Sequence, residues 1–303
     1  MVGLAPVKQQ VMELAQSAEV DQDRKRQGLP VSNKTMHLVM SGAPGTGKTT
    51  VARDIGRLYH ALGLVDKDPA TDEGFREISG PDLIARYKGQ SGAKVRALFE
   101  GDEKTGDGDM IGGVIFIDEA YSMVSGDNDE YGQQAVAELL RQAENHRDNT
   151  VVILAGYGPE MDTLLNSNTG MRRRFPTTLN FPELSLDDRF EVMQGLTREG
   201  KYTIGSGKKA TEVRHAMVDA LQYTGAGNAG DVRNLFEKIE TAQRVRLANQ
   251  KTSQGKPLTK RDLSTITTGD VKAGMNAYIV TGNVKDPIKG RLVPTSRKKK
   301  VAS

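Results

Sequence analysis

The sequence contains no cysteine, no tryptophan and only four histidines. Without cysteine the chain has no disulfide, no thiolate metal site and no cysteine nucleophile. The histidines lie in different segments, which argues against a histidine metal cluster: His37, His60, His146 and His215. Aromatic residues are few (5%) and charged residues are plentiful (27%). This composition predicts a soluble protein whose core is built from Leu, Val, Ile and Ala.

Long apolar runs are also missing. No stretch approaches the ~20 apolar residues of a membrane-spanning helix, and the N-terminus lacks the charged and apolar regions of a signal peptide. We therefore expect a cytoplasmic protein that does not associate with a membrane.

The positive charge is confined to one end of the chain. Residues 285–303 contain seven Lys or Arg and one Asp, a local charge of +6, whereas the whole chain carries +3. The rest of the chain is therefore mildly acidic, with a net charge of −3. This distribution makes nucleic acid an improbable partner of the folded part.

One segment fits the pattern of a phosphate-binding loop: Gly42-Ala43-Pro44-Gly45-Thr46-Gly47-Lys48-Thr49. A predicted strand at residues 36–40 precedes it, and apolar residues at helical spacing follow it from Val51 to Leu62. In such a loop, backbone N–H groups and the helix N-terminus face phosphate oxygens. Lys48 is expected to reach the β- and γ-phosphates and Thr49 to ligate Mg²⁺, and Thr50 also belongs to the predicted nucleotide-binding segment.

A second motif consists of four large apolar residues, 114–117, followed by Asp118 and Glu119. The apolar run predicts a strand that is buried on both faces of a parallel sheet. Ligands bind at the carboxyl ends of such strands, so Asp118 is expected to support Mg²⁺ and Glu119 to polarise a water molecule. The alternative is an acidic helix cap. Together with the loop at residues 42–49, the pair predicts ATP and Mg²⁺ as ligands.

Strands and helices alternate up to Pro182. Five strands are expected near residues 36–40, 75–79, 114–117, 151–155 and 178–181. The pattern predicts a doubly wound α/β domain over residues 1–182. Within it, we expect a polar stretch at 21–34, a short helix at 82–86 after Gly80-Pro81 has ended the second strand, and a mobile loop at 100–110.

The pattern becomes helical after Pro182. Ser185 and Asp188 resemble a capping box, the helical pattern continues to about Asn249, and another helix begins near residues 268–271. We predict a small all-helical lid domain over residues 183–275 and a basic, disordered tail over residues 276–303.

The combination resembles an AAA+ ATPase. Three segments, 2–8, 112–123 and 152–157, are similar to the group that contains the red-type Rubisco activase CbbX, the ATPase domain of the secretion protein EccA and the sporulation protein SpoVK. The similarity extends from residue 2 to about residue 240. Because EccA-like proteins carry a large N-terminal repeat domain before the ATPase domain, we expect a layout more like that of CbbX.

The resemblance implies roles for individual residues. Val2 and Gly3 would lie near the adenine, and Tyr157 would occupy the first sensor position. Arg174, or alternatively Arg172, would be the arginine finger that reaches the nucleotide of a neighbouring subunit. A site completed by a neighbour requires a homo-oligomeric ring, which in this family is a hexamer.

The sequence departs from the family in the lid. Relatives have Asn-Ala-Arg, in which the arginine is the second sensor, but Gly230 stands at that position here. Arg233, nearly one helical turn further on, is a candidate substitute.

Tyr87-Lys88-Gly89 corresponds to the central pore loop, in which an aromatic side chain grips a polypeptide. Lys88 replaces the usual apolar residue and could favour acidic segments. The leading hypothesis is an ATP-driven ring that threads a protein client of unknown identity. The alternatives are a nucleic-acid motor that uses the basic tail, and a low-turnover scaffold, which the missing lid arginine suggests.

Overall fold

The computed structural model describes residues 3–31, 35–85, 87, 89–101, 108–124, 129–225, 228–254 and 257–282. Its contacts divide the chain into two units. The first comprises Gly3–Ala43 and Gly47–Pro182, and the second comprises Pro44–Thr46 and the residues from Glu183 onward.

None of the helices among these residues combines the length and the apolar character that crossing a membrane would require.

The first unit is built on one five-stranded sheet. Its strands are β1 (Leu38–Gly42), β2 (Phe75–Ser79), β3 (Val114–Asp118), β4 (Val151–Gly156) and β5 (Thr177–Phe181). They are all parallel and lie in the order β2-β3-β4-β1-β5. The carboxyl ends of all five strands therefore share one edge, and the predicted α/β fold class is confirmed.

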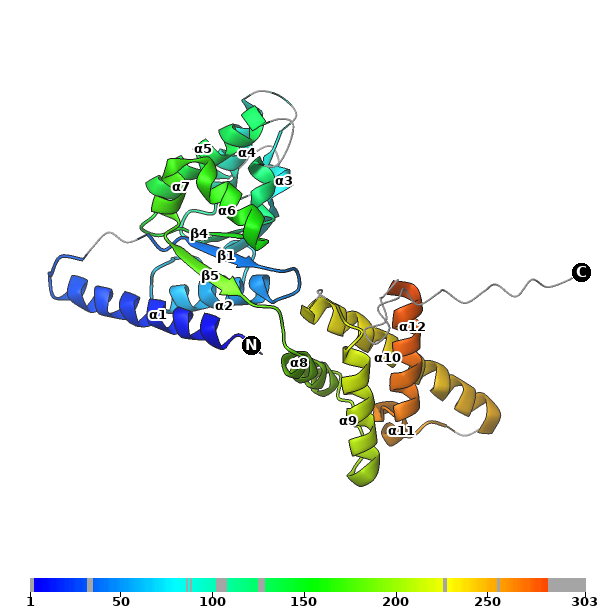
Figure 1. Cartoon of the computed structure of the whole chain (residues 1–303). Coiled ribbons are helices and arrows are strands. Elements are labelled where there is room, and N and C mark those ends of the chain that lie inside the picture. The colour runs from blue at the N-terminus through cyan, green and yellow to red at the C-terminus, as the bar shows by residue number, and fades with distance from the viewer. Residues whose placement is uncertain are drawn as a thin grey trace, which may run out of the picture. The chain divides into compact units, whose positions relative to one another are not determined.

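Helices cover both faces of this sheet. In chain order they are α1 (Ala5–Arg26), α2 (Lys48–Ala61), α3 (Gly80–Leu83), α4 (Gln90–Glu100), the 3₁₀ helix η1 (Ala120–Val124), α5 (Asp129–Asn145), α6 (Gly158–Ser167) and α7 (Thr169–Arg174). Figure 1 shows α1 and α2 on one face and α4 to α7 on the other.

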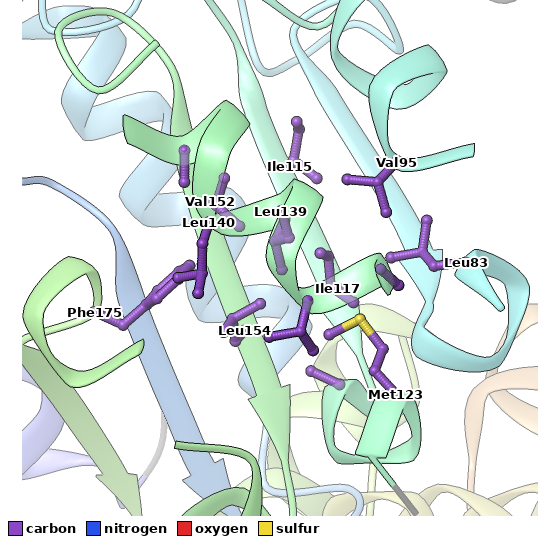
Figure 2. Packing of buried hydrophobic residues seen from close by; sticks show 14 of the residues in the cluster. Leu83, Val95, Ile115, Ile117, Met123, Leu139, Leu140, Val152, Leu154 and Phe175 are labelled. Carbon is purple, nitrogen blue, oxygen red and sulfur yellow. The ribbon is translucent and has the colours of Figure 1, made fainter. Parts of the chain in front are cut away.

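Strand β3 shows how the sequence produces this layered arrangement. Ile115 and Ile117 pack into the cluster under α4 and α5, whereas Val114 and Phe116 point into the cluster under α1 and α2. All four side chains are fully buried. Figure 2 shows the first cluster, in which Leu139 of α5 lies over the strand residues. The consecutive apolar residues thus fill two cores, as predicted for a strand covered on both faces.

One local prediction was wrong, and the polar stretch predicted at residues 21–34 is helical in its first part. The polar residues after Asp21 continue helix α1 to Arg26, because Gln, Lys and Arg are good helix formers on an exposed surface. Helix α3 begins at Gly80 and ends at Leu83, rather than spanning 82–86. Pro81 lies in the first turn of α3, where a proline needs no N–H partner.

The second unit consists of helices α8 (Leu186–Glu199), α9 (Gly207–Leu221), α10 (Asn228–Gln254), α11 (Lys260–Ser264) and α12 (Thr268–Gly282). The predicted capping box of Ser185 and Asp188 is confirmed. Apolar residues of α8, α9, α10 and α12 form one core. Helix α12 continues past residue 275, the predicted end of the lid. The tail from residue 283 lies outside the described residues.

Candidate nucleotide-binding site

The predicted phosphate loop connects the end of β1 to the start of α2. Gly45 and Gly47 have φ angles of 72° and 94°, in the left-handed region that favours glycine. At Gly42, a Cβ atom would lie 2.5 Å from the carbonyl oxygen of Phe181 on β5. The loop conformation therefore depends on glycine at three of its positions.

Lys48 lies within this loop. Its Nζ donates hydrogen bonds to the carbonyl oxygens of Gly42 (2.8 Å) and Ala43 (3.0 Å), and its side chain is buried. Burial lowers the pKa of Lys48, and the carboxylate of Asp118 partly opposes that shift. A desolvated ammonium group beside backbone dipoles is suited to binding an anion, so the residues present fit a phosphate group.

The N-terminus of α2 adds to this cationic character. In the part of the chain that the structure describes, no side-chain hydrogen bond caps the first turn of this 14-residue helix. Its N–H groups are those that bind phosphate in such loops. Thr49 is half-buried in the first turn and Thr50 is exposed. Thr49 and Asp118 supply the oxygen donors that Mg²⁺ prefers, so the donor set fits that ion.

The sheet topology brings the other predicted residues to the same edge. Asp118 and Glu119 end β3, Tyr157 follows β4, and the phosphate loop follows β1. Strand β4 lies between β3 and β1. Asp118 is half-buried, Glu119 is exposed, and the Tyr157 side chain is 47% exposed. Sequence positions more than a hundred residues apart therefore meet at one edge.

Glu119 has an unusual backbone conformation, with φ of 48° in a residue other than glycine. Its N–H donates to Oδ1 of Asp118 (2.9 Å), and its carbonyl oxygen accepts hydrogen bonds from the Ser122 amide (2.9 Å) and hydroxyl (2.7 Å). A Cβ atom at Gly80 would lie 2.5 Å from that carbonyl oxygen. Ser122 and Gly80 therefore fix the peptide that carries the Glu119 side chain.

Ser122 and Gly80 both contact the Glu119 peptide, and neither was predicted to belong to the site. The spacing of three residues between Glu119 and Ser122 is a signal for a local side-chain-to-backbone hydrogen bond. The contact of Gly80 follows from strand pairing, since Ser79 lies opposite Asp118. Pairing of this kind is a tertiary relationship that one sequence does not show.

The segment before α1 lies beside the loop. Gly3 has φ of 67°, and Cδ1 of Leu4 lies 3.9 Å from the position of a Cβ atom at Gly47. The N-terminal segment therefore lies close to Gly47, and the placement of Gly3 near an adenine stays a prediction. Val2 lies outside the described residues.

The two candidate finger arginines lie on α7. Nε of Arg172 donates to Asn166 (3.0 Å), and its Nη2 lies 3.4 Å from Asp162. Nε of Arg174 lies 3.1 Å from Oε2 of Glu144 on α5, and 28% of the Arg174 side chain is exposed. Both candidates therefore pair with acidic residues of their own chain.

The predicted pore loop follows α3. The Tyr87 side chain is 69% exposed. Gly89 has φ of 83°, and its N–H donates to Oε1 of Gln134 on α5 (3.0 Å). Lys88 lies outside the described residues. An exposed aromatic side chain thus precedes an anchored turn.

In the lid, Gly230 and Arg233 lie in the first two turns of α10, and both are exposed. A Cβ atom at Gly230 would meet no atom within 4 Å among the described residues. The position therefore accepts a Cβ atom without a clash.

Comparison with known proteins identifies the family. Residues 38–183 match the family model described as ATPase family associated with various cellular activities (AAA). Residues 191–277 match the AAA lid domain. The chain is 34% identical to the protein CbbX of Cereibacter sphaeroides over 274 residues, which cover 90% of this chain and 83% of that protein. This chain belongs to the AAA family.

Other relatives of this AAA protein differ in length. Stage V sporulation protein K of Bacillus subtilis is 32% identical, and the match covers 89% of this chain and 79% of that protein. The ESX-3 secretion system protein EccA3 of Mycolicibacterium smegmatis is 34% identical, with 89% of this chain covered. The match spans 44% of the length of EccA3.

Solved structures agree with the fold. The AAA domain of FIGL-1 in complex with ADP has a TM-score of 0.60 and 20% identity, and the match covers 91% of this chain and 82% of that one. Membership of the AAA family implies that this protein binds a nucleotide.

Proposed function

We propose that this AAA protein binds and hydrolyses Mg-ATP, assembles into a ring and remodels a protein client. One observation carries the ATPase proposal: a buried Lys48 in a glycine-rich loop and the Asp118-Glu119 pair lie at one edge of the same parallel sheet. The loop supplies a phosphate site and the acids supply a metal ligand and a base, which together are the requirements for phosphoryl transfer to water.

Each residue has a defined task in this proposal. Lys48 and the N-terminus of α2 hold the phosphates, and Thr49 and Asp118 would hold Mg²⁺. The ion held there would supply charge neutralisation for the phosphates. Glu119 orients the attacking water and accepts its proton. The exposed Tyr157 hydroxyl donates a hydrogen bond to the γ-phosphate or to that water.

Two variants separate binding from hydrolysis. Lys48→Ala should abolish binding of a fluorescent ATP analogue. Glu119→Gln should bind it normally but hydrolyse ATP about a hundredfold more slowly, because a general base contributes ~10²–10⁴ in rate. Glu77→Gln, at an exposed carboxylate on β2 that pairs with Arg53 at 3.3 Å, is the matched control. Parental turnover by Glu119→Gln would contradict the role of Glu119.

The ring is proposed because Arg174 would act on a neighbouring subunit. Mixing tests this: Lys48→Ala and Arg174→Ala should each be inactive alone, whereas their mixture should recover part of the activity. In the mixture, an intact Arg174 on one subunit completes the intact nucleotide site of the other, and such fingers contribute about 10³–10⁵ in rate. Arg172→Ala is mixed in parallel. If activity recovers only in the mixture of Lys48→Ala with Arg172→Ala, the finger is Arg172. If activity recovers in neither mixture, action in trans is refuted.

Client remodelling is proposed from the exposure of Tyr87. Casein, an unfolded acidic polypeptide, should stimulate ATP turnover. Tyr87→Ala should lose this stimulation, while Tyr87→Phe, which keeps the aromatic ring, should retain it. Equal stimulation of Tyr87→Ala and the parent would exclude the threading mechanism.

A further inference from the structure

A cavity of about 500 Å³ lies in the first unit, well away from the phosphate loop. Met36, Leu38 and Thr177 line it, and these residues precede or begin strands β1 and β5. The phosphate loop follows the opposite end of β1. The cavity is therefore at the amino-terminal edge of the sheet, and residues of α1 form its outer wall.

The lining has an apolar part and a charged part. Leu14 and Ala18 of α1, together with Leu38 and Leu64, provide apolar surface. Cavities of roughly 300–1,000 Å³ with mostly apolar walls and a few polar groups are typical of small-molecule sites. The volume of this cavity lies within that range, and its lining is polar and apolar in similar parts.

Tyr59 is the most informative residue of the lining. It is only 3% exposed, and its hydroxyl makes no hydrogen bond to any of the residues that the structure describes. Burial alone raises the pKa of Tyr59 to about 12, so the hydroxyl stays protonated and is a donor. The hydroxyl belongs to the cavity lining, where it can donate a hydrogen bond to a bound molecule.

The charged groups indicate the sign of the ligand. Lys25 and Arg173 line the cavity and form no ion pair within the described ranges, and neither does Asp21. Arg147 pairs with Glu144 at 2.6 Å, and Asp148 lies 4.0 Å from Arg147. The unpaired groups of the lining thus carry one excess positive charge, which favours a ligand with a single negative charge.

We propose that this cavity binds a small amphipathic monocarboxylate. Its aliphatic or aromatic body packs against Leu14, Leu38 and Leu64, its carboxylate faces Lys25 and Arg173, and the Tyr59 hydroxyl donates a hydrogen bond to it. The site is separate from the nucleotide site and does not depend on ATP hydrolysis.

The position of the cavity links it to α7. Arg173 lies between the two candidate finger arginines, and the cavity residue Arg147 shares Glu144 with Arg174. A carboxylate bound at Lys25 and Arg173 would add a negative charge to the cavity that Arg147 lines, and would thereby alter the environment of Glu144. Occupancy should therefore change the rate of ATP turnover, a consequence that rests on the proposed function, whereas the binding itself does not.

Calorimetry on the full chain tests the binding. Decanoate, used below its micellar concentration, should bind saturably at one molecule per chain. Decyltrimethylammonium, which has the same body and the opposite charge, and acetate, which has the head group alone, should both bind at least tenfold more weakly. Binding of the cation as tightly as decanoate, or binding that does not saturate, would overturn the proposal.

Three variants locate the site. Ala18→Trp fills the cavity from half-buried Ala18 on α1 and should abolish binding. Arg173→Ala, at an exposed residue, should weaken binding about fivefold. The matched control is Arg214→Ala at an exposed arginine of α9, which should leave binding unchanged. Decanoate binding of parental strength in both Ala18→Trp and Arg173→Ala would exclude this cavity as the site.

Tyr59→Phe distinguishes a ligand contact from a structural role. It should weaken decanoate binding about threefold to tenfold, yet it should not lower the melting temperature of the free protein, because the lost hydroxyl has no partner among the described residues. Unchanged affinity would refute the role of Tyr59.

If decanoate binds as expected but leaves ATP turnover unchanged, the site stands and its coupling to Arg174 is refuted. If the protein hydrolyses no ATP, binding is still measurable.

Discussion

The carbonyl oxygen of Glu119 accepts two hydrogen bonds from Ser122, one from the amide at 2.9 Å and one from the hydroxyl at 2.7 Å. A non-glycine residue in the left-handed region costs about 1–2 kcal/mol, and these bonds offset part of that cost. The conformation directs the Glu119 side chain from the end of β3. If Glu119 is the base, as proposed, the catalytic geometry depends on the backbone of Glu119 as well as on its carboxylate.

Removing the Ser122 hydroxyl should reduce turnover while ATP binding is preserved. In Ser122→Ala the amide hydrogen bond remains, so we expect kcat to fall about fivefold, the equivalent of roughly 1 kcal/mol, with KM unchanged. Steady-state ATPase assays measure both. Ser167→Ala is the matched control, because the Ser167 hydroxyl donates to the Leu164 carbonyl at the same 2.7 Å and the same spacing. A lower kcat in the control as well would attribute the loss to general destabilisation.

Gly80→Ala should disturb the same peptide more strongly. The added Cβ would lie 2.5 Å from the Glu119 carbonyl oxygen and 2.6 Å from Oγ of Ser122, so one of them must move. We expect kcat to fall about a hundredfold, as geometric displacement at an active site commonly produces, with nucleotide affinity retained. Gly92→Ala on α4, whose new Cβ would meet nothing closer than 3.7 Å, should keep full activity. Full activity in Gly80→Ala would show that this contact does not set the position of Glu119.

The sheet was predictable because its strands carry strong local signals. The run from Val114 to Ile117 is apolar at every position and is preceded by glycines, which is typical of a strand covered on both faces. The helical state of residues 22–26 was not predicted, for the opposite reason. Residues Gln22 to Arg26 bury little surface. Their helical state depends on helix propensity and on continuity with the preceding turns, and neither produces an apolar pattern in the sequence.

The site was predictable only in part, for a related reason. Lys48 and Asp118 stand in contiguous motifs whose chemistry is local. The pairing of Arg174 with Glu144 joins α7 to α5, and neither residue has a neighbour in sequence that suggests it. Likewise, nothing near Tyr59 in sequence indicates the cavity that it lines. Contacts between distant segments follow from packing, so they require the structure.

His37 should make stability depend on pH. Burial lowers the pKa of His37 from 6.5, and weaker contributions from Ala143 and Glu144 oppose the shift. Its Nδ1 accepts from the N–H of Val152 (3.1 Å) and its Nε2 lies 2.8 Å from the carbonyl oxygen of Ala143. These contacts fix the neutral tautomer with the proton on Nε2. Protonation would put a second N–H against that of Val152.

The direction in which stability changes with pH follows from the number of protons that the folded and unfolded chains bind. Below pH 6.5 the unfolded chain protonates this histidine and the folded chain does not, so the free energy of unfolding falls as the pH falls. The loss should approach ~1.4 kcal/mol per pH unit. Glu138, whose pKa its hydrogen bond with Arg141 lowers to about 2, adds a loss only below pH 4.5. Urea unfolding between pH 7 and 5 therefore isolates His37. His37→Gln should remove most of this slope, and His215→Gln, at an exposed residue of α9, should keep it.

The lid contains a buried ion pair that should dominate its stability. Asp270 is 2% exposed and accepts hydrogen bonds from Nε (2.8 Å) and Nη2 (3.0 Å) of Arg246, and from the Thr267 hydroxyl (2.8 Å). Breaking a buried pair costs about 3–5 kcal/mol. Because Arg246 is 34% exposed, we expect about 2–3 kcal/mol for Asp270→Asn by denaturant unfolding. Asp262 accepts the corresponding hydrogen bond from the hydroxyl of exposed Thr259, and Asp262→Asn should cost about 1 kcal/mol or less. Equal costs would show that the ion pair adds nothing.

Gly230→Arg tests whether the missing lid arginine limits this protein. Gly230 is exposed, and a Cβ there would meet no described atom within 4 Å. Replacing a helical glycine should stabilise α10 by about 0.5–1 kcal/mol. If the arginine contacts the γ-phosphate as the family resemblance implies, ATP should bind about threefold to tenfold more tightly, with little change for ADP. Gly195→Arg on α8, which is equally open, supplies the same charge and the same helix propensity elsewhere in the lid. Equal affinities in the two variants would mean that position 230 does not reach the nucleotide. That result would favour Arg233 as the residue that contacts the γ-phosphate. In that case Arg233→Ala should weaken ATP binding in the parental chain.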